Sequence, residues 1–82
     1  GEIAEKPVMY YLDNNDAKVR SRVYRILENI GTDLSLKKVT SNARKERVPD
    51  MKLLAESCRD QIKDRVRAAA EAEKQKTTDS SE

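Results

Sequence analysis

The chain has 82 residues, of which 39% are charged, compared with roughly 25% in ordinary globular domains, and it contains no His, Phe or Trp. The absence of His removes the commonest general base and metal ligand, and the single cysteine, Cys58, excludes an internal disulfide, so we expect no enzyme, no metal and no cofactor. No apolar run approaches the length of a bilayer span, and the composition favours one small domain in a reducing compartment, cytoplasm or nucleus.

The first helix is expected from about Ala4 to Leu12. Val8, Tyr11 and Leu12 fall on one side of it at helical spacing, and Pro7 is placed in its opening turn, where proline is tolerated. Two asparagines follow and interrupt the helical pattern. The sequence therefore predicts a short amphipathic helix that ends before a polar turn.

A second helix is expected between Asp16 and Gly31. The carboxylate of Asp16 suits an N-cap, because it can accept hydrogen bonds from backbone amides at the positive end of a helix. Gly31 is expected to end the helix in a left-handed conformation. The apolar residues of the segment share one arc, and they are Val19, Val23, Ile26, Leu27 and Ile30.

The stretch from Pro7 to Gly31 resembles a HEAT repeat, a helical hairpin in which Asp residues cap the turn and Val-Arg opens the second helix. The residues that carry the resemblance are Pro7, Leu12, Asp13, Asp16, Val19, Arg20, Val23, Leu27 and Ile30. The resemblance implies that Arg20 packs along the seam between hairpins, beside acidic groups of a neighbour. No second copy of the pattern follows, so the hairpin is either part of a free-standing domain or a terminal repeat of a longer protein.

The third segment begins near Thr32 to Ser35 and ends at Val48-Pro49. Leu36, Val39 and Ala43 form a thin apolar stripe, which polar residues poor in helix propensity interrupt. Because the residue before a proline disfavours helical geometry, Val48 ends this segment and Asp50 is expected to cap the next.

The last helix is expected from Met51 to about Lys76. Leu54, Cys58, Ile62 and Val66 repeat at four-residue steps, with Met51, Ala55 and Ala69 beside them. Cys58 on this stripe is expected to be a buried structural thiol. Residues 75–82 are predicted to form a flexible acidic tail rich in Ser and Thr.

A second resemblance covers Val23 to Val66. Its helices, the Leu34-Ser35-Leu36 turn and the closing Leu53-Leu54-Ala55 helix are similar to the N-terminal helical domains of transcription elongation factors. Those domains bind short linear motifs, so this resemblance also implies a docking role.

Charge is distributed unevenly along the chain. Residues 1–16 carry a net charge of −3, residues 17–49 a net +6 and residues 50–82 a net −1. The basic middle is the segment expected to contact an anionic partner. The predicted partner-binding residues are Lys18, Arg22, Arg25, Lys37, Lys38, Arg44, Lys45 and Arg47.

These observations predict an all-α domain over residues 1–74, a bundle of three or four helices packed as stacked antiparallel hairpins. Its function is predicted to be non-catalytic docking to another protein with an acidic surface or peptide, and the alternative is nucleic-acid binding through residues 18–47. The pattern leaves the oligomeric state open. The expected core is Val8, Tyr11, Leu12, Val19, Val23, Ile26, Leu27, Ile30, Leu36, Val39, Leu54, Cys58, Ile62 and Val66.

Overall fold

The computed structural model describes the backbone of residues 2–80 and the side chains of residues 5–73. Its elements are α1 (Glu2–Tyr10), the 3-10 turn η1 (Tyr11–Asp13), α2 (Ala17–Ile30), α3 (Asp33–Lys45) and α4 (Pro49–Ser80). No strand occurs among residues 2–80. The predicted all-α fold is confirmed.

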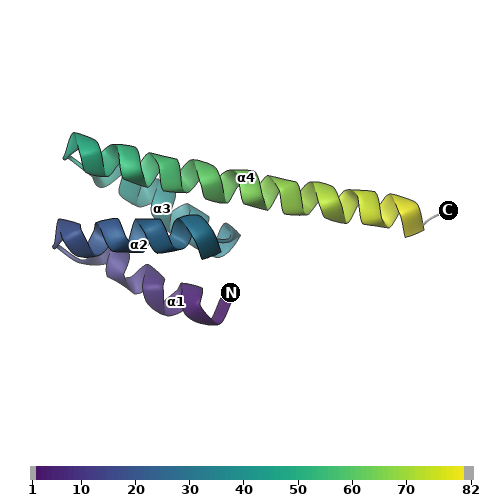
Figure 1. The fold of residues 1–82 in the computed structure, drawn as a ribbon, viewed down its shortest axis with the longest axis horizontal. Helices are drawn as coiled ribbons and strands as arrows, with labels where there is room; N and C mark the ends of the chain where they lie inside the picture. The colour runs from purple at the N-terminus through teal and green to yellow at the C-terminus, as the bar shows by residue number, and fades with distance from the viewer. Residues whose placement is uncertain (1, 81–82) are drawn as a thin grey trace.

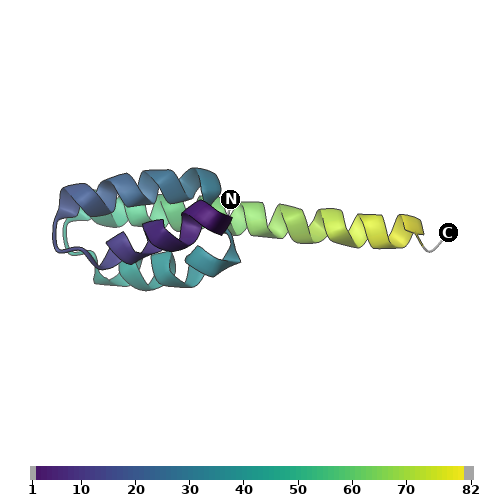
Figure 2. The ribbon, with the colours of Figure 1, turned by 90° about the horizontal axis from the view of Figure 1, so that it is seen from below.

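Consecutive helices run antiparallel, so the chain forms one hairpin of α1 and α2 and another of α3 and α4 (Figure 1). Seen from below, α1 lies in front of α4, and α2 and α3 lie on opposite sides of α1 (Figure 2). The helix α4 continues well past the other three, and the molecule is 53 Å long for that reason. The bundle is therefore compact at one end and a single helix at the other.

The core lies between the two hairpins. Most of the expected core residues are buried or packed against the buried cluster, including Cys58 and Ile62 of α4. Two expectations are wrong, because Tyr11 is 56% exposed and Ile26 is 44% exposed. Tyr11 lies in a 3-10 turn, whose tighter winding changes the angle between successive side chains, so Leu12 faces inward and Tyr11 does not.

Tyr24 is fully buried and takes the place that the sequence pattern gave to Ile26. The buried face of α2 is therefore centred closer to Tyr24 than expected. The Tyr24 hydroxyl donates a hydrogen bond to the Glu46 carboxylate at the end of α3, at 2.7 Å, and this contact favours its burial. A buried tyrosine normally needs such a partner for its hydroxyl. Helical periodicity alone does not reveal that partner.

The helix ends agree with the sequence expectations only in part. Asp16 caps α2 by accepting from the Lys18 amide, as expected, and Thr32 caps α3 by accepting from the Leu34 amide. Asp50 is no cap, because α4 already begins at Pro49, and proline is well suited to the first position of a helix. Pro7 lies inside α1, beyond its first turn, because α1 begins at Glu2.

Gly31 does not adopt the left-handed conformation expected of it. Its φ is −63° and its ψ is 141°, which any residue can adopt. The requirement is one of space, since a Cβ at this position would lie 2.6 Å from Cδ1 of Ile62 and 2.6 Å from the Leu27 carbonyl oxygen. Glycine therefore allows α4 to approach the end of α2 closely.

The helix α4 has 32 residues, and its backbone is helical as far as Ser80. The predicted flexible tail covers residues 75–82, whose side chains lie outside the described residues, so it stays a prediction. Among the described residues, no helix combines the length and the apolar character needed to cross a bilayer.

Replacing Gly31 by Ala is expected to lower the free energy of unfolding by about 1–3 kcal/mol, because the added methyl group overpacks the contact with Ile62 and Leu27. Urea denaturation followed by circular dichroism measures the effect. The double variant Gly31→Ala, Ile62→Val removes the clashing Cδ1 and should recover part of the loss. Strictly additive effects of the two substitutions would contradict this account.

Candidate functional site

A polar network joins the two hairpins at the end of the bundle where α2 begins and α3 ends. The Arg20 guanidinium donates to both carboxylate oxygens of Glu46, at 2.9 and 3.0 Å, and to the carbonyl oxygen of Asn14 at 2.8 Å. These contacts join the start of α2 to the end of α3. Burial raises the pKa of Glu46, but hydrogen bonds from Arg20 and Tyr24 lower it more, so the pKa lies below its usual value.

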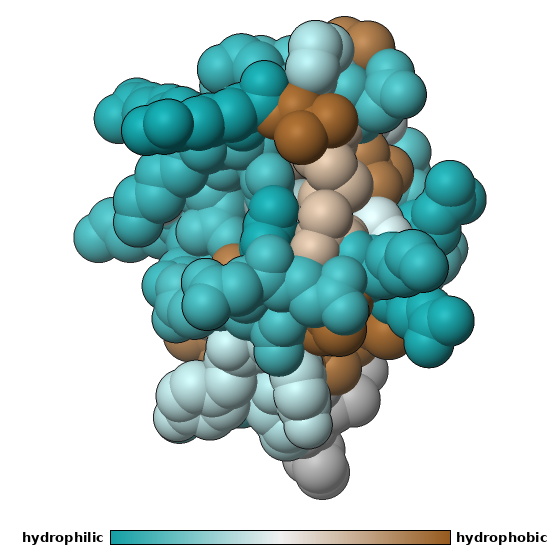
Figure 3. Space-filling view, turned by 90° about the vertical axis from the view of Figure 1, so that its left-hand side faces the viewer, coloured by the Kyte–Doolittle hydropathy of each residue, from teal (hydrophilic) through white to brown (hydrophobic). Residues whose placement is uncertain are grey.

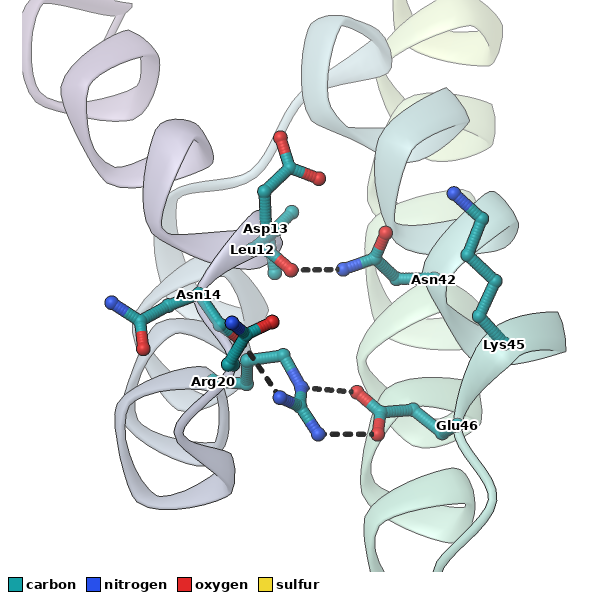
Figure 4. Close-up of a pocket in the computed structure, with 8 residues that line it drawn as sticks. Leu12, Asp13, Asn14, Arg20, Asn42, Lys45 and Glu46 are labelled. Carbon is teal, nitrogen blue, oxygen red and sulfur yellow. Dashed lines mark hydrogen bonds and ion pairs between the residues drawn. The ribbon is translucent and has the colours of Figure 1, made fainter.

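Two further contacts fix η1 against α3. The Asn42 side-chain amide donates to the Leu12 carbonyl oxygen at 2.6 Å, and the Lys38 ammonium forms an ion pair with the Asp13 carboxylate at 2.7 Å. Between these contacts and the Arg20–Glu46 pair lies a recess of about 360 Å³, here called the polar recess. Asp13, Asn42, Lys45 and Glu46 line it together with the Asn14-Asn15 turn (Figure 4).

The end of the bundle that contains this recess is mostly hydrophilic. Seen from that end, hydrophilic side chains project on both sides and hydrophobic surface forms only a narrow strip (Figure 3). Tyr11 and Val48 are among the exposed large apolar side chains of the molecule. A polar recess in such a surface offers hydrogen-bond donors and acceptors and little area for an apolar ligand group.

A second recess of about 260 Å³ lies on the other side of the Asp13–Lys38 ion pair, between α1 and α3. It is here called the apolar recess, because Met9, Tyr10 and Leu34 line it. Lys6 and the Asp13–Lys38 ion pair border it. Tyr10 is 77% exposed and Leu34 is 43% exposed. Two large apolar side chains thus face solvent beside cationic groups.

Glu5 holds α1 in the position that creates the apolar recess. Its side chain is fully buried, and its carboxylate accepts from the Thr32 amide at 2.8 Å, from the Thr32 hydroxyl at 2.8 Å and from the Ser35 amide at 3.1 Å. It therefore binds the first amides of α3, where the helix dipole favours a negative charge. Burial raises the pKa of Glu5, but the hydrogen bonds from Ser35 and Thr32 lower it more, so the pKa lies below its usual value.

The predicted partner-binding residues do not form a single patch. Lys18, Arg22 and Arg25 lie on the outward face of α2, and the others lie on α3 and the loop after it, on the opposite side of α1 (Figure 2). Lys37 and Arg44 border a shallow recess of about 640 Å³ over α3, which Asp33, Leu36, Thr40 and Ser41 also line. Lys38 is paired with Asp13, whereas the other seven predicted cations form no ion pair among the described residues.

Three residues that position the site were missed from the sequence: Glu5, Glu46 and Arg65. Arg65 of α4 donates to the carbonyl oxygens of Glu28 and Gly31 and so caps the end of α2 from another helix. Each of the three acts on residues that are distant in sequence, and no local pattern marks them. The only available signal was the presence of a charged residue within a predicted apolar arc.

Cys58 is fully buried, as predicted for a core thiol. Burial raises its pKa to about 12, with Glu28 acting in the same direction and Arg65 in the opposite one. The thiol is therefore neutral at physiological pH and has no access to solvent.

Comparison with known proteins finds no matching family model, no similar curated protein and no similar solved structure.

The free energy of unfolding is expected to be constant near neutral pH and to fall as the pH drops below about 4.5. Glu5 and Glu46 have lowered pKa values in the folded state, so the stability they contribute is present above the unfolded-state pKa and is lost as the pH falls through the folded-state pKa. Thermal denaturation at a series of pH values measures this dependence. In the variant Glu5→Gln the acid-induced loss should be smaller, and an unchanged slope would contradict the assignment.

The variant Glu46→Gln is expected to lose about 3 kcal/mol of unfolding free energy, because it leaves the largely buried Arg20 guanidinium without a counter-charge. Chemical denaturation measures the loss. The matched control is Asp60→Asn, which breaks the exposed Arg59–Asp60 pair and should cost less than about 0.5 kcal/mol. Equal losses in the two variants would show that the Arg20–Glu46 pair stabilises the fold no more than an exposed ion pair does.

Proposed function

We propose that this protein is a non-catalytic docking module that binds a short acidic segment of another protein on the face formed by α1, η1 and α3. This surface, the α1–α3 face, consists of the apolar recess, the polar recess and the Asp13–Lys38 ion pair between them. The single observation that carries the proposal is an apolar recess with exposed Tyr10 and Leu34 directly beside cationic side chains.

The size of the apolar recess suits one or two side chains of a peptide. Binding sites for drug-sized ligands enclose roughly 300–1,000 Å³, so a recess of about 260 Å³ is matched to a smaller group such as an aliphatic or aromatic side chain. Aromatic and methionine side chains are enriched at protein interfaces, and both types line this recess in Tyr10 and Met9. The anchor is therefore an apolar side chain of the partner.

The charges around the recesses select acidic neighbours for that anchor. Lys6 borders the apolar recess and Lys45 borders the polar one, and neither forms an ion pair among the described residues. Carboxylates on either side of the anchor would gain charge-assisted contacts with these ammonium groups. The acids that line the recesses, Asp13 and Glu46, are already paired with Lys38 and Arg20, so a basic peptide finds no unpaired carboxylate there and is disfavoured.

The face is also rigid enough to select a ligand. Glu5 fixes α1 to the start of α3, and Asn42 fixes η1 to the C-terminal part of α3, so α1 and η1 are both attached to the same helix. A preformed recess lowers the ordering entropy that binding would otherwise cost. A peptide can therefore bind with few contacts.

The proposal places the protein inside the cell, in the cytoplasm or the nucleus, in agreement with a single cysteine that is buried and unpaired. The similarity of residues 23–66 to the N-terminal helical domains of transcription elongation factors, which bind linear motifs, supports the same role.

The test uses isotope-labelled protein titrated with a library of short peptides that contain one aliphatic or aromatic residue between acidic residues. Amide chemical-shift changes are expected to cluster at Met9, Tyr10, Leu34 and Lys38. The variant Tyr10→Ala, Leu34→Ala should weaken binding at least tenfold, because both exposed walls of the recess are lost.

The matched control is Leu53→Ala, which removes an exposed leucine of α4, 65% exposed and outside both recesses. It should bind as the unmodified protein does. Shift changes confined to α4, or equal binding of peptides in which Asp and Glu are replaced by Lys, would overturn the proposal.

A further inference from the structure

The outward face of α2 is a second charged surface, separate from the α1–α3 face. Lys18, Arg22 and Arg25 are exposed and follow one another at steps of four and three residues, so they form a line along one side of the helix. This line is here called the α2 stripe. The exposed side chain of Asn29 continues it by one more step.

The α2 stripe contains no acidic side chain. The only acid within α2 is Glu28, which is half-buried and lies three residues beyond Arg25, and no ion pair joins the two. Asp16 precedes the stripe, and its carboxylate accepts from the Lys18 backbone amide. None of the three cations forms an ion pair among the described residues. The stripe is therefore a surface of uniform positive charge.

The other cationic surface of the molecule differs in this respect. On α3, Asp33 lies beside Lys37 and Arg44, and Lys38 is neutralised by Asp13. The α2 and α3 surfaces also point away from each other, because the two helices flank α1 on opposite sides (Figure 2). A ligand on the α2 stripe would leave the α1–α3 face open.

We propose that the α2 stripe binds the phosphate backbone of double-stranded DNA without sequence preference. Protein interfaces are enriched in aromatic residues and Met at their centre, and the stripe has neither of these. Phosphate contacts require only cations and polar donors, and Arg suits phosphate through its paired N–H groups. The inference does not depend on the proposed peptide binding.

The geometry allows all three cations to act together. Lys18 and Arg25 are seven residues apart, which is about 10 Å along a helix at 1.5 Å per residue. Duplex DNA carries one phosphate charge per roughly 1.7 Å of its axis, so several phosphates lie within reach of a line of this length. Three contacts predict binding at the weak end of the non-specific range, with a Kd of about 10⁻⁴ M at physiological salt.

The test is fluorescence anisotropy with a labelled duplex of about 20 base pairs and mixed sequence, at salt concentrations from about 50 to 200 mM. Three phosphate contacts give a slope of log K against log salt near −2.7, which is about a 40-fold loss of affinity over this range. The variants Arg22→Gln and Arg25→Gln should each reduce the magnitude of the slope by about 0.9.

The matched controls are Lys37→Gln and Arg44→Gln, which remove exposed cations from α3 and should leave the slope unchanged. All four positions are exposed, so circular dichroism should report the same fold in every variant. Tyr10→Ala, Leu34→Ala should lose peptide binding and keep DNA binding, which separates this inference from the proposed function. No detectable DNA binding at low salt, a flat salt response, or loss of binding in the α3 variants alone would overturn it, as would equally tight binding of polyglutamate.

Discussion

Two buried carboxylates determine how the hairpins are joined. Glu46 at the end of α3 receives hydrogen bonds from Arg20 and Tyr24 of α2, and Glu5 of α1 receives them from the first turn of α3. A buried carboxylate is stable only when its oxygens are satisfied, so each of these contacts admits one relative position of its partners. Among the described residues, no buried side-chain nitrogen or oxygen lacks a partner.

The proposed docking surface depends on these contacts. Apolar burial is non-directional and would tolerate several positions of α1 on the bundle, whereas the bonds of Glu5 to Thr32 and Ser35 specify one. That position brings Met9 and Tyr10 next to Leu34 and thereby forms the apolar recess. The polar recess depends in the same way on the Arg20–Glu46 pair that lines it. The shape of the proposed docking surface thus depends on interactions that are themselves polar and buried.

The sequence was sufficient for the local features of the fold and insufficient for contacts between distant segments. The Asp16 cap, the apolar stripe of α4 and the buried Cys58 follow from helical spacing and capping chemistry, and all three are present. Tyr11 and Ile26 were assigned to the core by spacing alone and are exposed, because a 3-10 turn and a buried tyrosine changed which side of each helix faces inward.

Site residues show the same division. The eight cations were recognised from composition, but their separation onto two faces depends on α2 and α3 lying on opposite sides of α1, which no local pattern encodes. Tyr10 and Leu34 meet only because Glu5 reaches across 30 residues to Ser35. Long-range polar contacts of this kind carry no periodic signal.

The length of α4 has a mechanical consequence. Its residues up to Val66 pack against the bundle, whereas residues 67–73 are exposed on every side. Helical structure there relies mainly on the intrinsic preference of its alanines for that conformation, since these residues are exposed and Ala69 only borders a recess beside Gly31. The outer part of α4 can therefore unfold locally, in response to temperature or to a neighbouring molecule, while the packed part stays helical. The free energies of unfolding of the two parts of this helix are separate quantities.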